Sequence, residues 1–168
     1  FGDAWLSQAT AFDEEVILSN LDWKCDMYMG LADPNKIFKI KEKYARFNFP
    51  NLVHPDVKLD EDYVELYEGN VISAGCIFTV DVVLGSFNVF NTRVTIGHDV
   101  QIGSFNVFQP NVQISGFVKI GDKNTFCVNS CVLQLKTIGN NNMLGANSLL
   151  IKSIGNDKKY FGLPATKI

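Results

Sequence analysis

His98 and Asp99 are adjacent in a chain of 168 residues that contains only two histidines. Imidazole exchanges protons near neutral pH, so a histidine beside a carboxylate has the chemistry of a general base. Asp99, or Asn91 a few residues upstream, could hold the ring in one tautomer, as the third group of a catalytic triad does. A surface histidine, a turn carboxylate and a turn-capping asparagine are the purely structural alternatives.

A six-residue period sets the positions of these side chains. Apolar residues occupy all fifteen positions in steps of six from Leu66 to Leu150, although only 46% of the chain is hydrophobic. Asparagine recurs at a constant interval, at 70, 88, 106, 124 and 142. A period of six does not fit an amphipathic helix, but it fits a short strand followed by a turn. The asparagine interval is three times six, so three hexads form one coil. We therefore predict a mainly β chain, with a parallel β-helix of triangular section over 56–152.

The repeat also predicts where the candidate base lies. His98 follows the inward Ile96 by two positions, where the hexad leaves its strand, so its imidazole should point outward from a corner. Gly116 occupies the equivalent position of the next coil and should lie beside His98 at the same corner. Its missing side chain would leave room beside the imidazole and expose a backbone N–H. A plain turn glycine with positive φ is the alternative.

The segment over 1–55 lacks the six-residue period. Its pattern predicts helices over 13–21 and 34–47 and strands over 25–32 and 51–54. Alternating elements of this kind predict part of a small Rossmann-like α/β domain over 1–55. Residues 153–168 are expected to form a C-terminal tail.

Composition excludes several functional classes. A formal net charge of −3 argues against nucleic acid or an anionic membrane as a partner. The sequence has no apolar run long enough to cross a membrane and no signal peptide. The four cysteines show no CxxC spacing and are interpreted as reduced structural thiols. These features together predict a cytoplasmic protein.

The order of these parts resembles one enzyme family. An α/β segment, "FPNLVHP", coils with "FNTRVTIGHDVQIG" and "ISGFVKIG", and a closing "GLPATKI" are similar to hexapeptide-repeat sugar acyltransferases. This family is related to the sialic acid O-acetyltransferases and to the N-acetyltransferases of bacillosamine and perosamine sugars. The resemblance implies a left-handed β-helix, a homotrimer with acetyl-CoA in the groove between subunits, and an N-terminal domain that holds a sugar nucleotide.

The resemblance also implies roles for individual residues. His98 would be the general base, and the Gly116 amide would contact the acetyl carbonyl, which suits oxyanion stabilisation. Asp3, in "FGDAW", matches an acidic position of the sugar-nucleotide domain. Five residues would contact acetyl-CoA, the first three along its groove and the last two near its adenine: Val107, Val128, Ala146, Pro164 and Ala165.

The resemblance therefore predicts an acetyl-CoA-dependent N-acetyltransferase that acts on a nucleotide-linked amino-deoxy sugar in surface glycan biosynthesis. O-acetylation of sialic acid or of another sugar hydroxyl is the alternative. A non-catalytic β-helix scaffold is a remote one, since its corners would have no need of a histidine, an aspartate and a stacked glycine. A β-helix zinc enzyme needs three histidines, and this chain has only His54 and His98. No metal is expected.

Overall fold

The computed structural model of the protein describes residues 25–168, so Asp3 and the helix expected over 13–21 lie outside the described residues. Within this part of the chain, one helix is followed by eighteen strands, each only a few residues long. In chain order they are α2 (Pro34–Lys43), β1 (Leu52–Val53), β2 (Val64–Leu66), β3 (Val71–Ile72), β4 (Ile77–Phe78), β5 (Val82–Leu84), β6 (Val89–Phe90), β7 (Thr95–Ile96), β8 (Gln101–Ile102), β9 (Val107–Phe108), β10 (Gln113–Ile114), β11 (Lys119–Ile120), β12 (Thr125–Phe126), β13 (Cys131–Val132), β14 (Thr137–Ile138), β15 (Met143–Leu144), β16 (Leu149–Leu150), β17 (Lys159–Gly162) and β18 (Ala165–Lys167).

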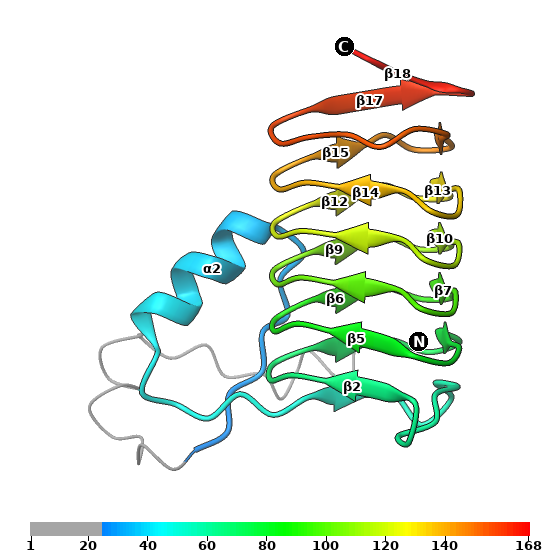
Figure 1. Ribbon diagram of the computed structural model, residues 1–168. Coiled ribbons are helices and arrows are strands. Elements are labelled where there is room, and N and C mark those ends of the chain that lie inside the picture. The colour runs from blue at the N-terminus through cyan, green and yellow to red at the C-terminus, as the bar shows by residue number, and fades with distance from the viewer. Residues whose placement is uncertain (1–24) are drawn as a thin grey trace, which may run out of the picture.

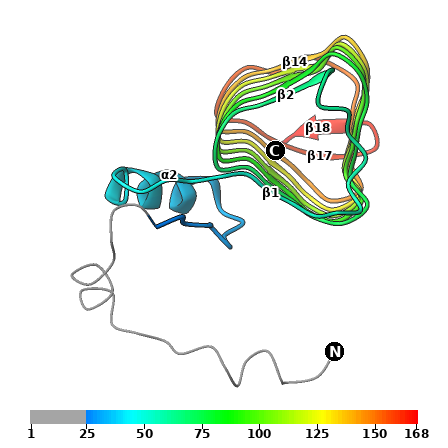
Figure 2. The same cartoon turned by 90° about the horizontal axis from the view of Figure 1, so that it is seen from below.

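The strands form three sheets that face one another around a triangular prism (Figure 2). The first sheet has the order β1-β3-β6-β9-β12-β15-β17-β18, the second runs from β4 to β16, and the third from β2 to β14. Val71, Val89 and Val107 pair in register, which is the offset of the repeat. As the chain climbs in Figure 1, β14 runs to the left at the front and β17 runs to the right at the back. The coil is therefore left-handed, as the resemblance implied.

The predicted inward series fills the prism. Of its fifteen positions, fourteen are buried and only Leu66, at the first coil, is partly buried. Phe90, Phe108 and Phe126 stack face to face with ring centroids 4.6 and 4.8 Å apart. These spacings match the distance of about 4.8 Å between paired strands, so the rings repeat with the backbone. The six-residue pattern thus predicted the core correctly.

The recurring asparagines stack into a hydrogen-bonded ladder along one corner. At the corner between the third and first sheets, the side-chain oxygen of Asn88 accepts both the backbone N–H and the side-chain amide of Asn106, at 2.9 and 3.0 Å. Asn106 does the same for Asn124, at 2.9 and 3.0 Å. These amides are completely or almost completely buried. The ladder satisfies turn groups that would otherwise be buried without a partner.

The ends of the β-helix differ from the expectation. The strand predicted over 51–54 appears as β1, but it pairs with β3 and so extends the first sheet rather than an α/β domain. At the other end, β17 continues the first sheet in parallel to β15, and β18 folds back on β17 as an antiparallel hairpin. The segment over 153–168 is therefore a cap that continues the coil.

Helix α2 packs beside the ladder corner (Figure 2). Asp33 caps its first turn, and its side chain accepts the backbone N–H groups of Asn35 and Lys36. The helix ends at Lys43, before the predicted limit of residue 47, and Phe47 and Phe49 instead enter a cluster between helix and prism. The strand predicted over 25–32 is absent, since only one isolated bridge, between Asp26 and Asn48, forms there.

Candidate active site

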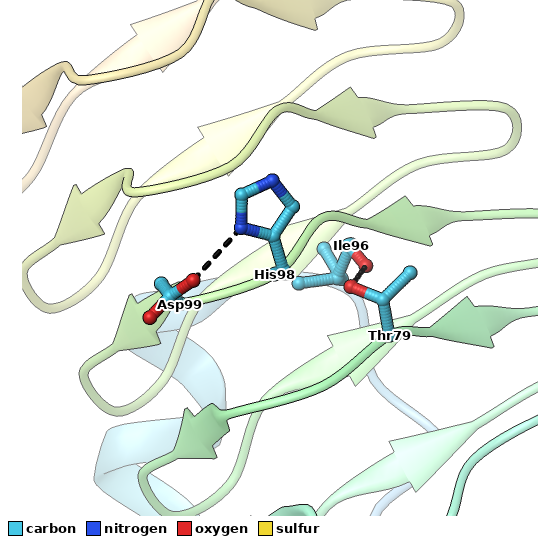
Figure 3. Close-up of polar contacts among 4 residues, drawn as sticks. All are labelled: Thr79, Ile96, His98 and Asp99. Carbon is cyan, nitrogen blue, oxygen red and sulfur yellow. Dashed lines mark hydrogen bonds and ion pairs between the residues drawn. The ribbon is translucent and has the colours of Figure 1, made fainter.

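His98 and Asp99 lie together at the corner between the second and third sheets, between β7 and β8; we call this the His98 corner. The Asp99 carboxylate is 2.8 Å from the imidazole Nδ1 (Figure 3). Both side chains are partly open to solvent, with exposed fractions of 50% and 41%. Because Asp99 accepts the hydrogen of Nδ1, the ring presents Nε2 as its proton acceptor. The predicted pairing of these two residues therefore exists.

The backbone of the corner aims the two side chains. Ile96 points inward, and its carbonyl accepts hydrogen bonds from the backbone and the side chain of Thr79, at 3.1 and 3.2 Å, which fixes the strand that leads into the corner (Figure 3). Asp99 has a φ of +56°, and its N–H donates to the Val80 carbonyl at 3.0 Å. Aspartate tolerates this left-handed conformation better than most residues. The turn thus places the carboxylate beside the ring that precedes it.

Gly116 lies directly against the imidazole, one coil beyond it, as the repeat predicted. A Cβ atom built on Gly116 would be 2.7 Å from the His98 Nε2 and 2.8 Å from its Cε1. Only glycine leaves space for the ring in this position. Among the described residues, no acceptor binds the Gly116 N–H, so this donor is available beside the base.

Phe117 is a neighbour of the base that sequence reasoning missed. Its ring lies 4.9 Å from the imidazole, with an interplanar angle of 89°, and Phe117 is 47% exposed. The Phe117 N–H also donates to the His98 carbonyl at 2.9 Å. The signal was present in "ISGF", because the residue after Gly116 must be near His98 if Gly116 is.

Asn91 is not a partner of His98 within one chain. It lies at the corner between the first and second sheets, which we call the Asn91 corner, and its amide donates to the Gln109 side chain at 3.1 Å. Val128 and Ala146 stack at the same corner, and both are exposed. One chain therefore divides the predicted site residues between the two corners that border the second sheet.

Two of the residues expected to contact acetyl-CoA have buried side chains. Val107 points outward from β9, but its side chain is fully buried in the cluster with α2. Ala165 is 3% exposed and packs in the core beneath the cap. Pro164, in the turn between β17 and β18, is exposed. The resemblance could not reveal the burial of Val107, because it does not say which outward faces of the prism are covered by other elements.

Cys127 and Cys131 are unsuited to nucleophilic catalysis. Cys127 and Cys131 lie at the Asn91 corner and on the second sheet, and burial raises the pKa of both thiols. A thiol is a nucleophile only as a thiolate, which a raised pKa disfavours. All four cysteines are free. Within residues 25–168, no cluster of three or more histidine, cysteine or acidic side chains could hold a metal ion.

A groove of about 520 Å³ lies beside Asp99, at the third sheet. Its charged side chains are all acidic: Glu61, Asp62, Glu65, Asp81 and Asp99. His98 and Asp99, which we call the dyad, therefore border a strongly negative surface. Such a surface favours cations and repels carboxylates and phosphates.

No protein-family model and no curated protein matches this sequence. Solved structures do match. The acetyltransferase domain of PglB from Neisseria gonorrhoeae is 25% identical with a TM-score of 0.87, over 92% of this chain and 77% of that chain. PerB from Caulobacter crescentus, in complex with CoA and GDP-perosamine, is 23% identical with a TM-score of 0.82, over 85% and 70%. WeeI from Acinetobacter baumannii is 21% identical with a TM-score of 0.84, over 99% and 84%. The structure thus confirms the fold that the resemblance implied: the chain has the same left-handed β-helix fold as these solved structures.

Proposed function

We propose that the protein transfers an acetyl group from acetyl-CoA to the amine of a nucleotide-linked amino-deoxy sugar in surface glycan biosynthesis. The observation that carries this proposal is the arrangement of His98, Asp99 and Gly116 at one corner. The PglB domain has been solved with acetyl-CoA, and PerB with CoA and GDP-perosamine. Both share the fold of this chain, which supports the same donor and the same class of acceptor.

The geometry supports direct transfer to the acceptor. A sugar ammonium must lose a proton before its nitrogen attacks the thioester carbonyl, and the His98 Nε2 is placed to accept that proton. As the C–N bond forms, the carbonyl oxygen gains charge, and the free Gly116 N–H is the donor that would stabilise it. Collapse of the intermediate breaks the C–S bond, the His98 imidazolium gives its proton to the CoA thiolate, and the nitrogen releases its second proton to solvent to leave the neutral amide. Asp99 stabilises the imidazolium throughout.

The acidic groove supports an amine as the acceptor. The amino end of the acceptor is a cation, which the carboxylates around Asp81 and Asp99 attract, whereas the diphosphate of the same molecule must lie outside this groove. Sialic acid has a carboxylate and no cationic group, so it gains no such attraction. The groove therefore favours an amine over the sialic acid hydroxyl at this position.

A homotrimer would complete the donor site. Asn91 and Val128 lie at one border of the second sheet and His98 at the other, so a groove that uses both needs a neighbouring subunit. This sheet and the Asn91 corner also carry exposed apolar side chains that a neighbour would cover. They are Ile77, Val128, Leu133 and Ile151. Light scattering at micromolar concentration should give three times the mass of one chain, and a monomer would contradict this arrangement.

We propose a cytoplasmic location as well. The four cysteines are free, and Cys76, which is completely buried, is a core residue rather than half of a disulfide. Free thiols of this kind fit a reducing compartment. Within residues 25–168, no helix has the length and hydrophobicity to cross a bilayer.

A thiol-release assay tests the proposed reaction. Acetyl-CoA would be combined with GDP-, UDP- and dTDP-linked amino sugars and, separately, with free sialic acid. We expect CoA release with at least one amino-sugar nucleotide and none with sialic acid, and His98→Ala serves as the inactive control. Turnover with sialic acid alone would replace N-acetylation by O-acetylation. Binding of acetyl-CoA without turnover on any acceptor would favour a scaffold.

A further inference from the structure

Phe117 has a backbone conformation that is unusual for phenylalanine. It occupies the left-handed position of the turn one coil beyond Asp99, with a φ of +57°. Phenylalanine is unfavourable in this conformation, which asparagine, aspartate and glycine adopt more readily. The structure uses those more favourable residues at equivalent turns, such as Asp81 and Asn129. Phenylalanine at such a turn therefore costs free energy unless packing offsets that cost.

Packing beneath α2 offsets that cost for two other phenylalanines but not for Phe117. Phe87 and Phe105 also have left-handed φ values, of +59° and +61°, and both rings lie against the cluster beneath α2. Phe117 belongs to neither hydrophobic cluster of the described residues, and it is 47% exposed. Its ring makes an edge-to-face contact with the imidazole of His98. The contact that distinguishes Phe117 is therefore with the candidate base.

We propose that Phe117 is a positioning residue that holds the His98 imidazole in the orientation needed for proton transfer. This inference rests on the proposed function. Asp99 holds the half-exposed ring at Nδ1 only, and a ring held at one atom still pivots about that hydrogen bond. Phe117 contacts the ring from a second direction, and Gly116 leaves the space that the ring occupies. Together they hold Nε2 beside Gly116.

Phe117→Asn removes the ring without burdening the turn, because asparagine adopts positive φ readily. Leu135→Asn is the matched control. Leu135 lies one coil further along the His98 corner, has a φ of +60° and is 64% exposed. The control makes the same kind of change to the same corner away from the imidazole. Phe117→Tyr, which keeps an aromatic ring, is the conservative variant.

Nuclear magnetic resonance of the full chain, without substrate, reads the orientation of the ring directly. The chain has only two histidines, so His54 provides an internal reference. In the wild type we expect three-bond couplings of His98 that correspond to one rotamer, with the hydrogen on Nδ1. In Phe117→Asn the His98 couplings should average over several rotamers, while those of His54 stay unchanged. Leu135→Asn and Phe117→Tyr should both resemble the wild type.

Steady-state acetyl transfer provides the second measurement. Loss of an edge-to-face contact should lower kcat by roughly threefold to tenfold in Phe117→Asn, with the KM for both substrates unchanged. Phe117→Tyr should recover most of the loss, and Leu135→Asn should show none. His98 couplings in Phe117→Asn that match the wild type would overturn the proposal, whatever the activity. So would an equal loss of kcat in Leu135→Asn. A wild type that transfers no acetyl group refutes the proposed function instead, and the couplings still decide the role of Phe117.

Discussion

Gly116→Ala should disable the base while it leaves the fold intact. The new methyl group would lie 2.7 Å from the His98 Nε2, whereas ordinary contacts begin near 3.4 Å. Nε2 must therefore retreat by the difference, which is a large part of 1 Å. The backbone does not oppose the change, because the φ of Gly116 lies outside the left-handed range that disfavours alanine. The substitution thus acts on the position of one ring.

A misplacement of about 1 Å at a reacting group can cost roughly 10²-fold in rate. We expect Gly116→Ala to lower kcat by up to this factor, with little change in the KM for acetyl-CoA or in the melting temperature. Gly155→Ala is the matched control, since a Cβ there meets nothing within 4 Å. Thiol release measures kcat, and thermal unfolding shows whether the fold survives.

The double variant tests the reasoning most directly. If the methyl group acts only by displacing the imidazole, Gly116→Ala should cost almost nothing further in a His98→Ala background. A loss of the same size in both backgrounds would refute the reasoning, because the methyl group would then obstruct the substrate itself. Near-normal activity of Gly116→Ala alone would show that the ring at this corner does not take part in catalysis.

The other predictions concern the dyad and the ladder. His98→Ala should lower kcat by about 10²–10⁴-fold, the usual loss for a general base, while acetyl-CoA affinity measured by calorimetry survives. Asp99→Asn should cost only about tenfold, because the amide keeps an acceptor at Nδ1 and tolerates the turn but loses the charge that stabilises the imidazolium; the ratio of the two kcat values checks this order. Asn106→Ala should lower the free energy of unfolding by roughly 2–4 kcal/mol, measured with urea, because Asn124 loses the acceptor of two buried hydrogen bonds. An unchanged urea midpoint would show that the ladder contributes nothing to stability.

The sequence was informative wherever the repeat was unbroken. The inward series, the ladder and the meeting of His98 with Gly116 all follow from one constant coil length, so each could be predicted. The coil length changes at the ends: it is longer between the paired residues Leu52 and Val71, and shorter between Met143 and Lys159. A prediction that assumes one constant coil length therefore misses the first and last coils.

The remaining differences depend on contacts that no repeat encodes. Val107 looks like any other outward residue of its strand, and only the docking of α2 buries it. Asn91 fits the motif by spacing, yet its corner differs from that of His98. The strand expected over 25–32 has apolar residues of the right kind, but Met29 packs against the helix cluster instead of entering a sheet. Tertiary packing decided each case.

The uniform coil has a consequence for how such chains change length. Because Thr95, Gln113 and Cys131 pair in register from one coil to the next, a whole coil is the natural unit of insertion or deletion. A duplication of that length continues every ladder, whereas insertion of a single hexad keeps the inward residues inward but moves each later residue to another sheet or corner. The dyad and its glycine occupy only two adjacent coils, so coils added nearer the cap would lengthen the prism without altering the contacts among His98, Asp99 and Gly116. The number of coils can thus change while the geometry of this corner stays the same.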